Sequence, residues 1–193
     1  DLHDNVLLHC IFARQHVDRR ERATGQGASD LAHVQVGGAI GLRDGSGDAL
    51  AAHVARALGL QAGKVWHTDR SRFVALGNWL VLLSGTLGKI GQDVALMAQQ
   101  GLDEITLSGG GGSSAMAHKH NPIAAEAMVT LARFTAGQQG VLSQAMVHEQ
   151  ERSGAAWALE WLTVPAMAEA TGAALRHADR LLASVSGIGA TQD

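Results

Sequence analysis

The sequence has 193 residues, of which 46% are hydrophobic, and this is enough for one folded domain with a core. Its net charge of −3 offers no basic surface for nucleic acid or an anionic membrane, so we expect neither as a partner. A single cysteine, Cys10, cannot form an internal disulfide, which is typical of a cytoplasmic protein. The start of the chain does not read as a secretion signal, and the most apolar window, residues 78–87, is too short to span a bilayer.

Alanine and leucine are abundant, prolines are rare, and β-branched residues form no alternating runs, so the composition predicts an all-α fold. In chain order, we expect a helix over residues 2–23 and a loop over 24–30. The glycine-rich stretch 34–47 predicts irregular backbone. Asp48 is then a suitable N-cap for a short helix over residues 49–58.

The strongest periodic pattern follows Thr68, a candidate N-cap. Apolar residues alternate at spacings of three and four, which predicts the seam of a long helix in a near-antiparallel bundle. A helix over residues 69–100 would be roughly 50 Å long, and it needs partner helices to bury that seam. The seam residues are Phe73, Leu76, Leu80, Leu83, Leu87, Ile90, Val94 and Met97.

Two more long helices are expected in the second half of the chain. Asn121 as a cap and Pro122 in the first turn predict a helix that runs to about residue 147. A further helix is expected over residues 155–185, with a kink or short break at Pro165. We therefore expect an N-terminal segment of uncertain role (1–30), a central helical-bundle domain (31–185) and a tail (186–193).

Between these helices lies the stretch SGGGGSSAMAHKHNP, residues 108–122, which reads either as a flexible linker or as a functional loop. Its glycines allow close approach of the backbone to a ligand, and their N–H groups can turn onto an anion. Lys119 and Asn121 add a positive charge and hydrogen-bond donors directly before a helix N-terminus. These properties favour a carboxylate-binding loop over a linker.

The segment GSSAMAHKHNP resembles the signature of the fumarase/aspartase superfamily, G-S-S-x-M-P-x-K-x-N-P. Residues 144–165, QAMVHEQERSGAAWALEWLTVP, resemble the bacterial 3-carboxymuconate cycloisomerases, as do stretches between residues 36 and 99. The resemblance implies that the chain is the middle of a longer enzyme whose central domain is a long helical bundle. One departure is Ala117, which stands where the superfamily signature has proline.

The resemblance also implies roles for single residues. Ser113 corresponds to the superfamily's proton-abstracting base, with Ser114 beside it as a second candidate catalytic residue. Lys119 and Asn121 correspond to residues that hold a substrate carboxylate, and Met116 corresponds to a loop anchor. Loop N–H groups and a lysine would stabilise the negative charge of an enediolate intermediate.

Residues outside the loop leave alternatives open. His148, Glu149 and Arg152 are expected near the substrate through the resemblance, although such a charged run also suits a solvated helix end. His118 and His120 form an H-x-H pair, but no further ligands complete a zinc site, so no metal is expected. His67 is interpreted as a helix-entry residue. Trp157 and Trp161, four positions apart, are expected to pack on one helix face.

The resemblance favours a cofactor-independent cycloisomerase that closes 3-carboxy-cis,cis-muconate to a γ-lactone in aromatic-acid breakdown. It implies a small dicarboxylate or tricarboxylate substrate and a homotetramer with shared active sites. The alternatives are a fumarate-releasing lyase of the same superfamily, of the adenylosuccinate or argininosuccinate type, and a helical scaffold without activity.

Overall fold

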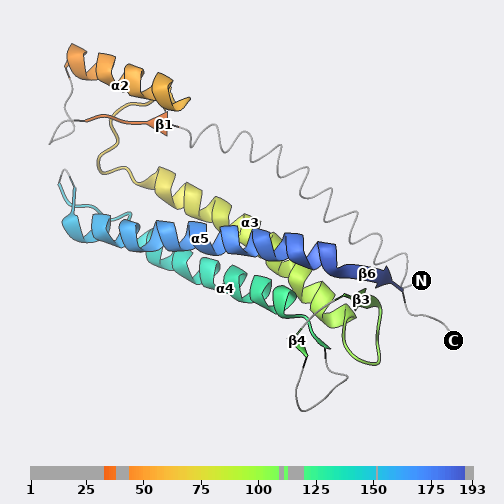
Figure 1. The fold of residues 1–193 in the computed structure, drawn as a ribbon. Coiled ribbons are helices and arrows are strands. Elements are labelled where there is room, and N and C mark those ends of the chain that lie inside the picture. Colours follow the sequence, from red (N-terminus) through yellow and green to blue (C-terminus); the bar gives the residue numbers. More distant parts are fainter. Residues whose placement is uncertain (1–32, 38–43, 109–110, 113–119, 151, 190–193) are drawn as a thin grey trace. The chain divides into compact units, whose positions relative to one another are not determined.

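The computed structural model describes residues 33–37, 44–108, 111–112, 120–150 and 152–189. Within them, helices α2 (Gly45–Leu58), α3 (Ser71–Met97), α4 (Ile123–Gln144) and α5 (Gly154–Ser184) dominate (Figure 1). The strands are short: β1 (His33–Val34), β2 (Gln61–Ala62), β3 (Ile105–Leu107), β4 (Gly111–Gly112), β5 (His120–Asn121) and β6 (Val185–Ile188). The predicted all-α helical fold is confirmed. The helix expected over 2–23 and the loop over 24–30 lie outside the described residues.

The chain divides into two compact units. Unit 1 contains the stretches Leu80–Gln138 and Pro165–Asp193, and unit 2 contains Arg14–Trp79 and Gln139–Val164. Each of the three long helices contributes one part to each unit, so the packing is described for each unit separately.

The core of unit 1 is apolar and is built from all three long helices, which lie side by side there (Figure 1). Leu87 and Val94 of α3 pack with Met128 of α4 and with Ala174 and Leu181 of α5. Every residue of the predicted α3 seam is buried or half-buried, so the periodic pattern identified the packed face correctly.

Small residues set how closely α3 and α4 approach within unit 1. A Cβ added at Gly88 would lie 2.6 Å from the Cβ of Ala132, and one at Gly91 would lie 2.6 Å from the backbone oxygen of Ala125. Cβ atoms essentially never approach backbone oxygens this closely, so only glycine fits at Gly91 without a backbone shift. The apolar periodicity did not reveal this second, glycine-lined contact face.

Two antiparallel strand pairs complete unit 1. Strand β3 pairs with β6, with Ile105 opposite Ile188, and the Ser108 N–H donates to the Ser184 carbonyl at 2.6 Å. Strand pairing therefore continues past residue 185, where the predicted helical domain ends. Strand β4 pairs with β5 directly before α4.

The helix starts differ from the predicted ones by a few residues. Helix α2 begins at Gly45, and its N-cap is Asp44, whose carboxylate accepts from the Gly47 N–H at 3.0 Å. The expectation that Asp48 is the cap is wrong, because the helix begins one turn earlier and Asp48 lies inside its first turn. Helix α3 begins at Ser71, three residues after the expected cap Thr68. There the Asp69 carboxylate accepts from the Ser71 N–H at 3.1 Å.

The two later helices agree more closely with the expectation. Helix α4 starts directly after Pro122, whose carbonyl accepts from the Glu126 N–H at 3.0 Å. Helix α5 runs without a break through Pro165, so the break considered at this proline is not present. Pro165 is exposed, and solvent can reach the carbonyl that loses its helical donor.

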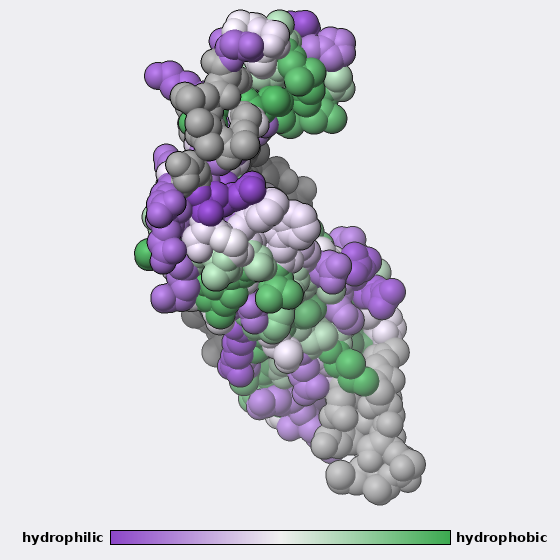
Figure 2. All heavy atoms as spheres, turned by 90° about the vertical axis from the view of Figure 1, so that its left-hand side faces the viewer, coloured by the Kyte–Doolittle hydropathy of each residue, from purple (hydrophilic) through white to green (hydrophobic). Residues whose placement is uncertain are grey.

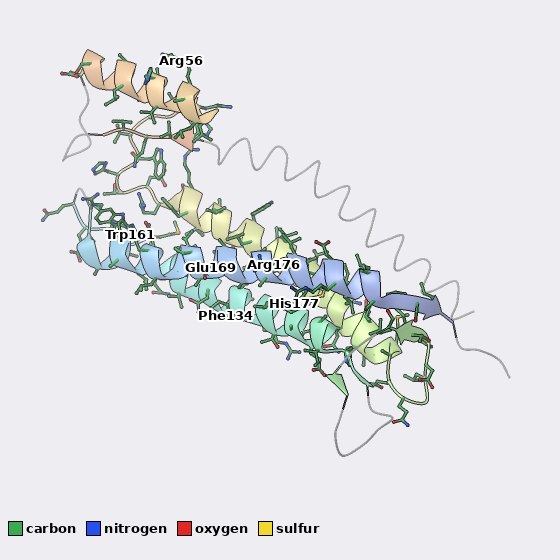
Figure 3. All side chains as sticks on the ribbon, viewed as in Figure 1. Arg56, Phe134, Trp161, Glu169, Arg176 and His177 are labelled. Carbon is green, nitrogen blue, oxygen red and sulfur yellow. The ribbon has the colours of Figure 1, made fainter. Side chains whose placement is uncertain are left out.

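Many large apolar side chains remain exposed on the helices, and Figure 2 shows apolar patches between polar ones on one face. In unit 1 they include Leu82, Leu96, Phe134, Leu175 and Leu182. A groove of about 710 Å³ lies between α4 and α5 there, with Phe134, Glu169 and Arg176 among its lining residues (Figure 3).

By length and composition alone, α3 could cross a membrane, since an 18-residue window has a mean hydropathy of 1.4. The window 78–87, considered too short, is thus part of a longer apolar helix. A core helix passes the same test, and the tight packing of Gly88 and Gly91 against α4 fits that explanation.

Candidate active site

The glycine-rich stretch forms the closing base of a hairpin. Gly111 pairs with Asn121 and Gly112 pairs with His120 in the antiparallel pair β4–β5. Both strands belong to unit 1, and β5 leads within two residues into α4. The stretch therefore does not link two separate domains. The β4–β5 pair lies directly before the N-terminus of α4, where backbone N–H groups and the helix dipole favour an anion.

Most of the expected loop residues lie outside the described part of the chain. These are Ser113, Ser114, Met116, His118 and Lys119. Asn121 is placed as a backbone position in β5, one residue before Pro122. The structure thus fixes where the loop begins and ends, while the roles of its side chains stay predictions.

The three residues expected after α4 differ in their surroundings. The His148 side chain is only 1% exposed, whereas Glu149 and Arg152 are exposed. The guanidinium carbon of Arg152 lies 3.9 Å from the centre of the Trp157 ring, a close cation–π contact. Only Glu149 and Arg152 can therefore meet a ligand directly, and His148 is a buried neighbour of them in sequence.

Unit 2 contains a buried ion pair. Arg70 donates from Nε to Glu160 Oε1 at 2.7 Å and from Nη2 to Glu160 Oε2 at 2.5 Å. The two side chains are 6% and 3% exposed. This bidentate arrangement is the geometry in which a buried guanidinium and carboxylate best compensate for lost hydration. Sequence reasoning missed both residues, because 90 positions separate them.

His148 completes this buried cluster. Its Nδ1 accepts from the Ser153 N–H at 3.2 Å. Its Nε2 lies 3.8 Å from Glu160 Oε1 and has no hydrogen-bond partner in the described part of the chain. Because Nδ1 is an acceptor, the neutral ring carries its proton on Nε2, facing the carboxylate. The Ser153 contact also ties the His148 ring to the turn that holds Arg152.

A pocket of about 240 Å³ opens beside the cluster, entirely within unit 2. The described residues that line it are mostly aromatic or cationic: Gln35, Trp66, His67, Arg70, Phe73, Arg152 and Trp157. Trp66 and Phe73 pack at 5.7 Å between ring centres, and the Arg70 guanidinium lies 4.4 Å from the Phe73 ring. Gln35 Oε1 accepts from the backbone N–H of Trp66 at 2.8 Å, which fixes this wall of the pocket.

His67 and Trp66 were not expected to belong to a site. Both line the pocket, and both carry a buried nitrogen that has no hydrogen-bond partner among the described residues, His67 Nδ1 and Trp66 Nε1. The available signal was composition: the run from Trp66 to Phe73 combines two aromatic residues with His67, Arg70 and Arg72. Trp157 and Trp161 do lie together, edge to face with 5.0 Å between ring centres, although Trp161 is 67% exposed (Figure 3).

Among the described residues, no group of three or more His, Cys, Asp or Glu side chains could hold a metal ion. His118 lies outside them, so the H-x-H pair is not tested. Around the pocket, the structure brings together the Arg152 guanidinium, the His67 imidazole and the Arg70–Glu160 ion pair. Cationic groups of this kind suit the binding of an organic anion.

Comparison with known proteins identifies the family. A family model described as "Lyase" matches residues 13–137, which is more than half of the chain. A 3-carboxy-cis,cis-muconate cycloisomerase of Acinetobacter baylyi is 37% identical over 152 residues, 75% of this chain and 34% of that protein. Trans-aconitate decarboxylase 1 of Mycosarcoma maydis is 35% identical over 156 residues, 77% of this chain and 32% of that protein.

A solved structure agrees with these sequence matches. The crystal structure of the 3-carboxy-cis,cis-muconate lactonizing enzyme from Pseudomonas putida superposes with a TM-score of 0.77 at 31% identity. The match covers 87% of this chain and 38% of that one. The chain spans about a third of the length of the curated relatives it matches. By sequence and by fold, it belongs to the fumarase/aspartase superfamily of lyases.

Proposed function

We propose that the chain forms the central part of a 3-carboxy-cis,cis-muconate cycloisomerase. The observation that supports this proposal is the β4–β5 strand pair, which joins the two ends of the signature segment GSSAMAHKHNP directly before α4. The similarity to cycloisomerases at 37% identity and to a lactonizing enzyme of the same fold supports the choice of reaction.

The proposed reaction is an isomerisation in which no atom is lost. A carboxylate oxygen of the substrate bonds to an alkene carbon and closes the lactone ring. The displaced π electrons move toward the neighbouring carboxylate and give an enediolate, and a proton is then delivered to carbon. Ser113 would transfer this proton, while Lys119, Asn121 and the loop N–H groups would stabilise the added negative charge.

Residues of unit 2 would assist through the substrate's charges. Arg152 and Glu149 are exposed and able to contact a ligand. His148 is buried, so we assign it a positioning role through Ser153 and Glu160. Met116 and Ser114 keep the loop-anchoring and secondary catalytic roles that the superfamily signature assigns to their positions.

The assembly proposed with this function is a cytoplasmic homotetramer whose subunits share active sites. The exposed apolar side chains on α3, α4 and α5 support association through the helix faces. A solution mass measured by light scattering should correspond to four chains, and a monomer at micromolar concentration would contradict the assembly.

A second candidate is another reaction on an unsaturated polycarboxylate. The relative named trans-aconitate decarboxylase 1, at 35% identity, favours keeping this alternative. Three readouts separate the candidates: loss of diene absorbance, appearance of fumarate and release of carbon dioxide.

The decisive experiment follows 3-carboxy-cis,cis-muconate with the full-length polypeptide. Lactone formation breaks the conjugation, so diene absorbance should fall without fumarate or carbon dioxide appearing. Ser113→Ala should lower turnover at least about 100-fold, the lower end of what acid–base catalysis contributes. Ser143→Ala is the matched control, because its hydroxyl only bonds the Gln139 carbonyl within α4. Normal turnover by the Ser113→Ala variant would overturn the assignment of the proton-transferring group.

A further inference from the structure

We propose that the groove between α4 and α5 of unit 1 is a self-association surface, on which α5 of a second copy of this chain packs antiparallel to α5 of the first. Glu169 of each copy then lies opposite Arg176 of the other. The proposal rests on the proposed function in one respect, since a homotetramer is part of that function. It adds the face through which two subunits meet and the charges that pair them.

The groove of about 710 Å³ is mostly apolar. Helix α4 contributes Leu131 and Phe134, and α5 contributes four alanines and Gly172. Phe134 is 44% exposed, so an aromatic ring on this surface is left uncovered by its own chain. Among the described lining residues, only Glu169 and Arg176 are charged. An apolar surface with few polar groups suits another protein surface better than a small ligand, which needs several convergent polar groups.

The two charges make this face complementary to a copy of itself. Glu169 and Arg176 are exposed and lie seven residues apart on α5, which is about two helical turns (Figure 3). Neither forms an ion pair with another described residue. In an antiparallel pair centred between Gly172 and Ala173, each glutamate faces the arginine of the other copy. Two reciprocal ion pairs therefore form, as a two-fold interface requires. A parallel pair would place like charges opposite each other, which is repulsive.

The neighbouring positions on the same helix face agree with this register. Counted outward from the same centre, Ala166 faces Asp179 of the second copy, and Pro165 faces Arg180. Pro165, Asp179 and Arg180 are exposed, and Ala166 is half-buried. Each charged side chain thus faces an uncharged residue or an opposite charge, and no two like charges meet along the face.

Gly172 supports close approach of another helix from outside. A Cβ added there has one described neighbour within 4 Å, the Arg176 Nη1 at 3.7 Å, which is an ordinary contact. Packing within the described part of the chain therefore does not require glycine at this position, unlike at Gly91. Glycine is disfavoured in the middle of a helix. A second helix that crosses at Gly172 explains the residue, because small side chains let two helix axes approach to roughly 8–10 Å.

The test is mass photometry of the full-length protein over a concentration series, with the concentration of half-dissociation as the readout. Loss of one exposed ion pair changes association little, so the variants reverse a charge instead. Glu169→Arg sets arginine against arginine at both contacts, and Arg176→Glu sets glutamate against glutamate. Each variant should raise the concentration of half-dissociation at least tenfold. Arg56→Glu, an exposed position of α2 in unit 2, makes the same charge change outside the groove and should leave it unchanged (Figure 3).

Mixing the two variants tests the orientation of the helices. A Glu169→Arg chain presents two arginines and an Arg176→Glu chain presents two glutamates, so opposite charges meet at both contacts only in the mixed pair. We expect the equimolar mixture to dissociate within about threefold of the wild-type concentration. The double variant Glu169→Arg/Arg176→Glu should do the same, because it exchanges the charges and keeps both pairs.

A further variant tests the close approach at the centre of the face. Gly172→Leu should raise the concentration of half-dissociation at least tenfold, since a large side chain separates the two helices. No described atom crowds the added Cβ within the chain, so the helicity measured by circular dichroism should not change.

Unchanged dissociation of both charge-reversed variants would overturn the proposal, as would a mixture that associates no more tightly than either variant alone. A monomeric wild type would also overturn it and would leave the groove to a different partner. If these results appear while 3-carboxy-cis,cis-muconate is turned over, the groove assignment is wrong and the cycloisomerase stands. If the variants and their mixture behave as expected but no diene is consumed, the interface is supported and the cycloisomerase is wrong.

Discussion

The two units bury polar groups of different kinds. In unit 1 the buried polar residues Ser84, Thr135 and Thr171 carry hydroxyls that donate to carbonyls of their own helices. In unit 2 the buried polar residues include a full ion pair, Arg70 with Glu160. A hydroxyl bonded within its helix needs no partner from elsewhere, whereas each buried charge depends on a distant residue. Unit 1 is thus a packing core, and unit 2 is a core organised around charge.

The largest expected effect comes from breaking the charged core. Glu160→Ala leaves the Arg70 guanidinium buried without its carboxylate, and such a loss destabilises by about 3–5 kcal/mol. Chemical denaturation should show this, while the exposed Glu169→Ala on the same helix should change stability by no more than about 0.5 kcal/mol. The double variant Arg70→Met/Glu160→Leu should recover much of the loss, because no charge then stays buried.

A smaller effect is expected from filling the close contact of unit 1. Gly91→Ala places a Cβ 2.6 Å from the Ala125 backbone oxygen and 3.0 Å from the Met128 Cβ, which should cost about 1–3 kcal/mol. Gly85→Ala is the matched control on α3, since nothing lies within 4 Å of its added Cβ. It should instead raise stability by up to about 1 kcal/mol through helix propensity. Equal shifts in the two unfolding midpoints would contradict the close α3–α4 contact.

Removing a hydroxyl from unit 1 should matter less than removing a charge from unit 2. Thr171→Val keeps the shape of a side chain that is 2% exposed and removes only its bond to the Met167 carbonyl. The expected loss is about 0.5–1.5 kcal/mol, the net contribution of one hydrogen bond. A loss as large as that of Glu160→Ala would remove the distinction between the two cores.

The smallest expected effect is a pH dependence at the helix starts of unit 2. The Ser71 hydroxyl and then the Ser71 N–H hold the pKa of the Asp69 carboxyl below its ordinary value of 3.8. A lowered folded-state pKa means that the stabilisation is present above 3.8 and is lost as the pH falls through the folded-state pKa. The difference in melting temperature between wild type and Asp69→Asn should therefore be constant near neutral pH and shrink in acid.

Local patterns predicted the helices well and their packing only in part. The seam from Phe73 to Met97 was readable because apolar spacing depends on one helix alone. Gly88 and Gly91 were not readable as a contact face, since their burial depends on where α4 lies. Asp44 and Asp48 are both good caps, and only the actual turn before α2 decides between them.

The candidate site shows the same limit. The signature segment was identified because it is continuous in the sequence, and its pairing β4–β5 follows from neighbouring residues. The pocket of unit 2 joins Gln35, the stretch from Trp66 to Phe73, and the turn at Arg152. No single stretch of the sequence therefore contains enough of the pocket residues to predict the pocket. His148, Glu149 and Arg152 were treated as one group because they are adjacent, yet burial separates the first from the other two.

The pairing of β3 with β6 has a consequence for the order of folding. It pairs residue 105 with residue 188, so more than eighty residues are synthesised after the first partner and before the second. Contacts so distant in sequence require a large loop to close before they form. Helices α3 and α4 can pack together early, but β3 stays unpaired until β6 has been synthesised. A nascent chain paused before Val185 would expose that edge, and it would be the natural binding site for a chaperone that recognises unpaired strands.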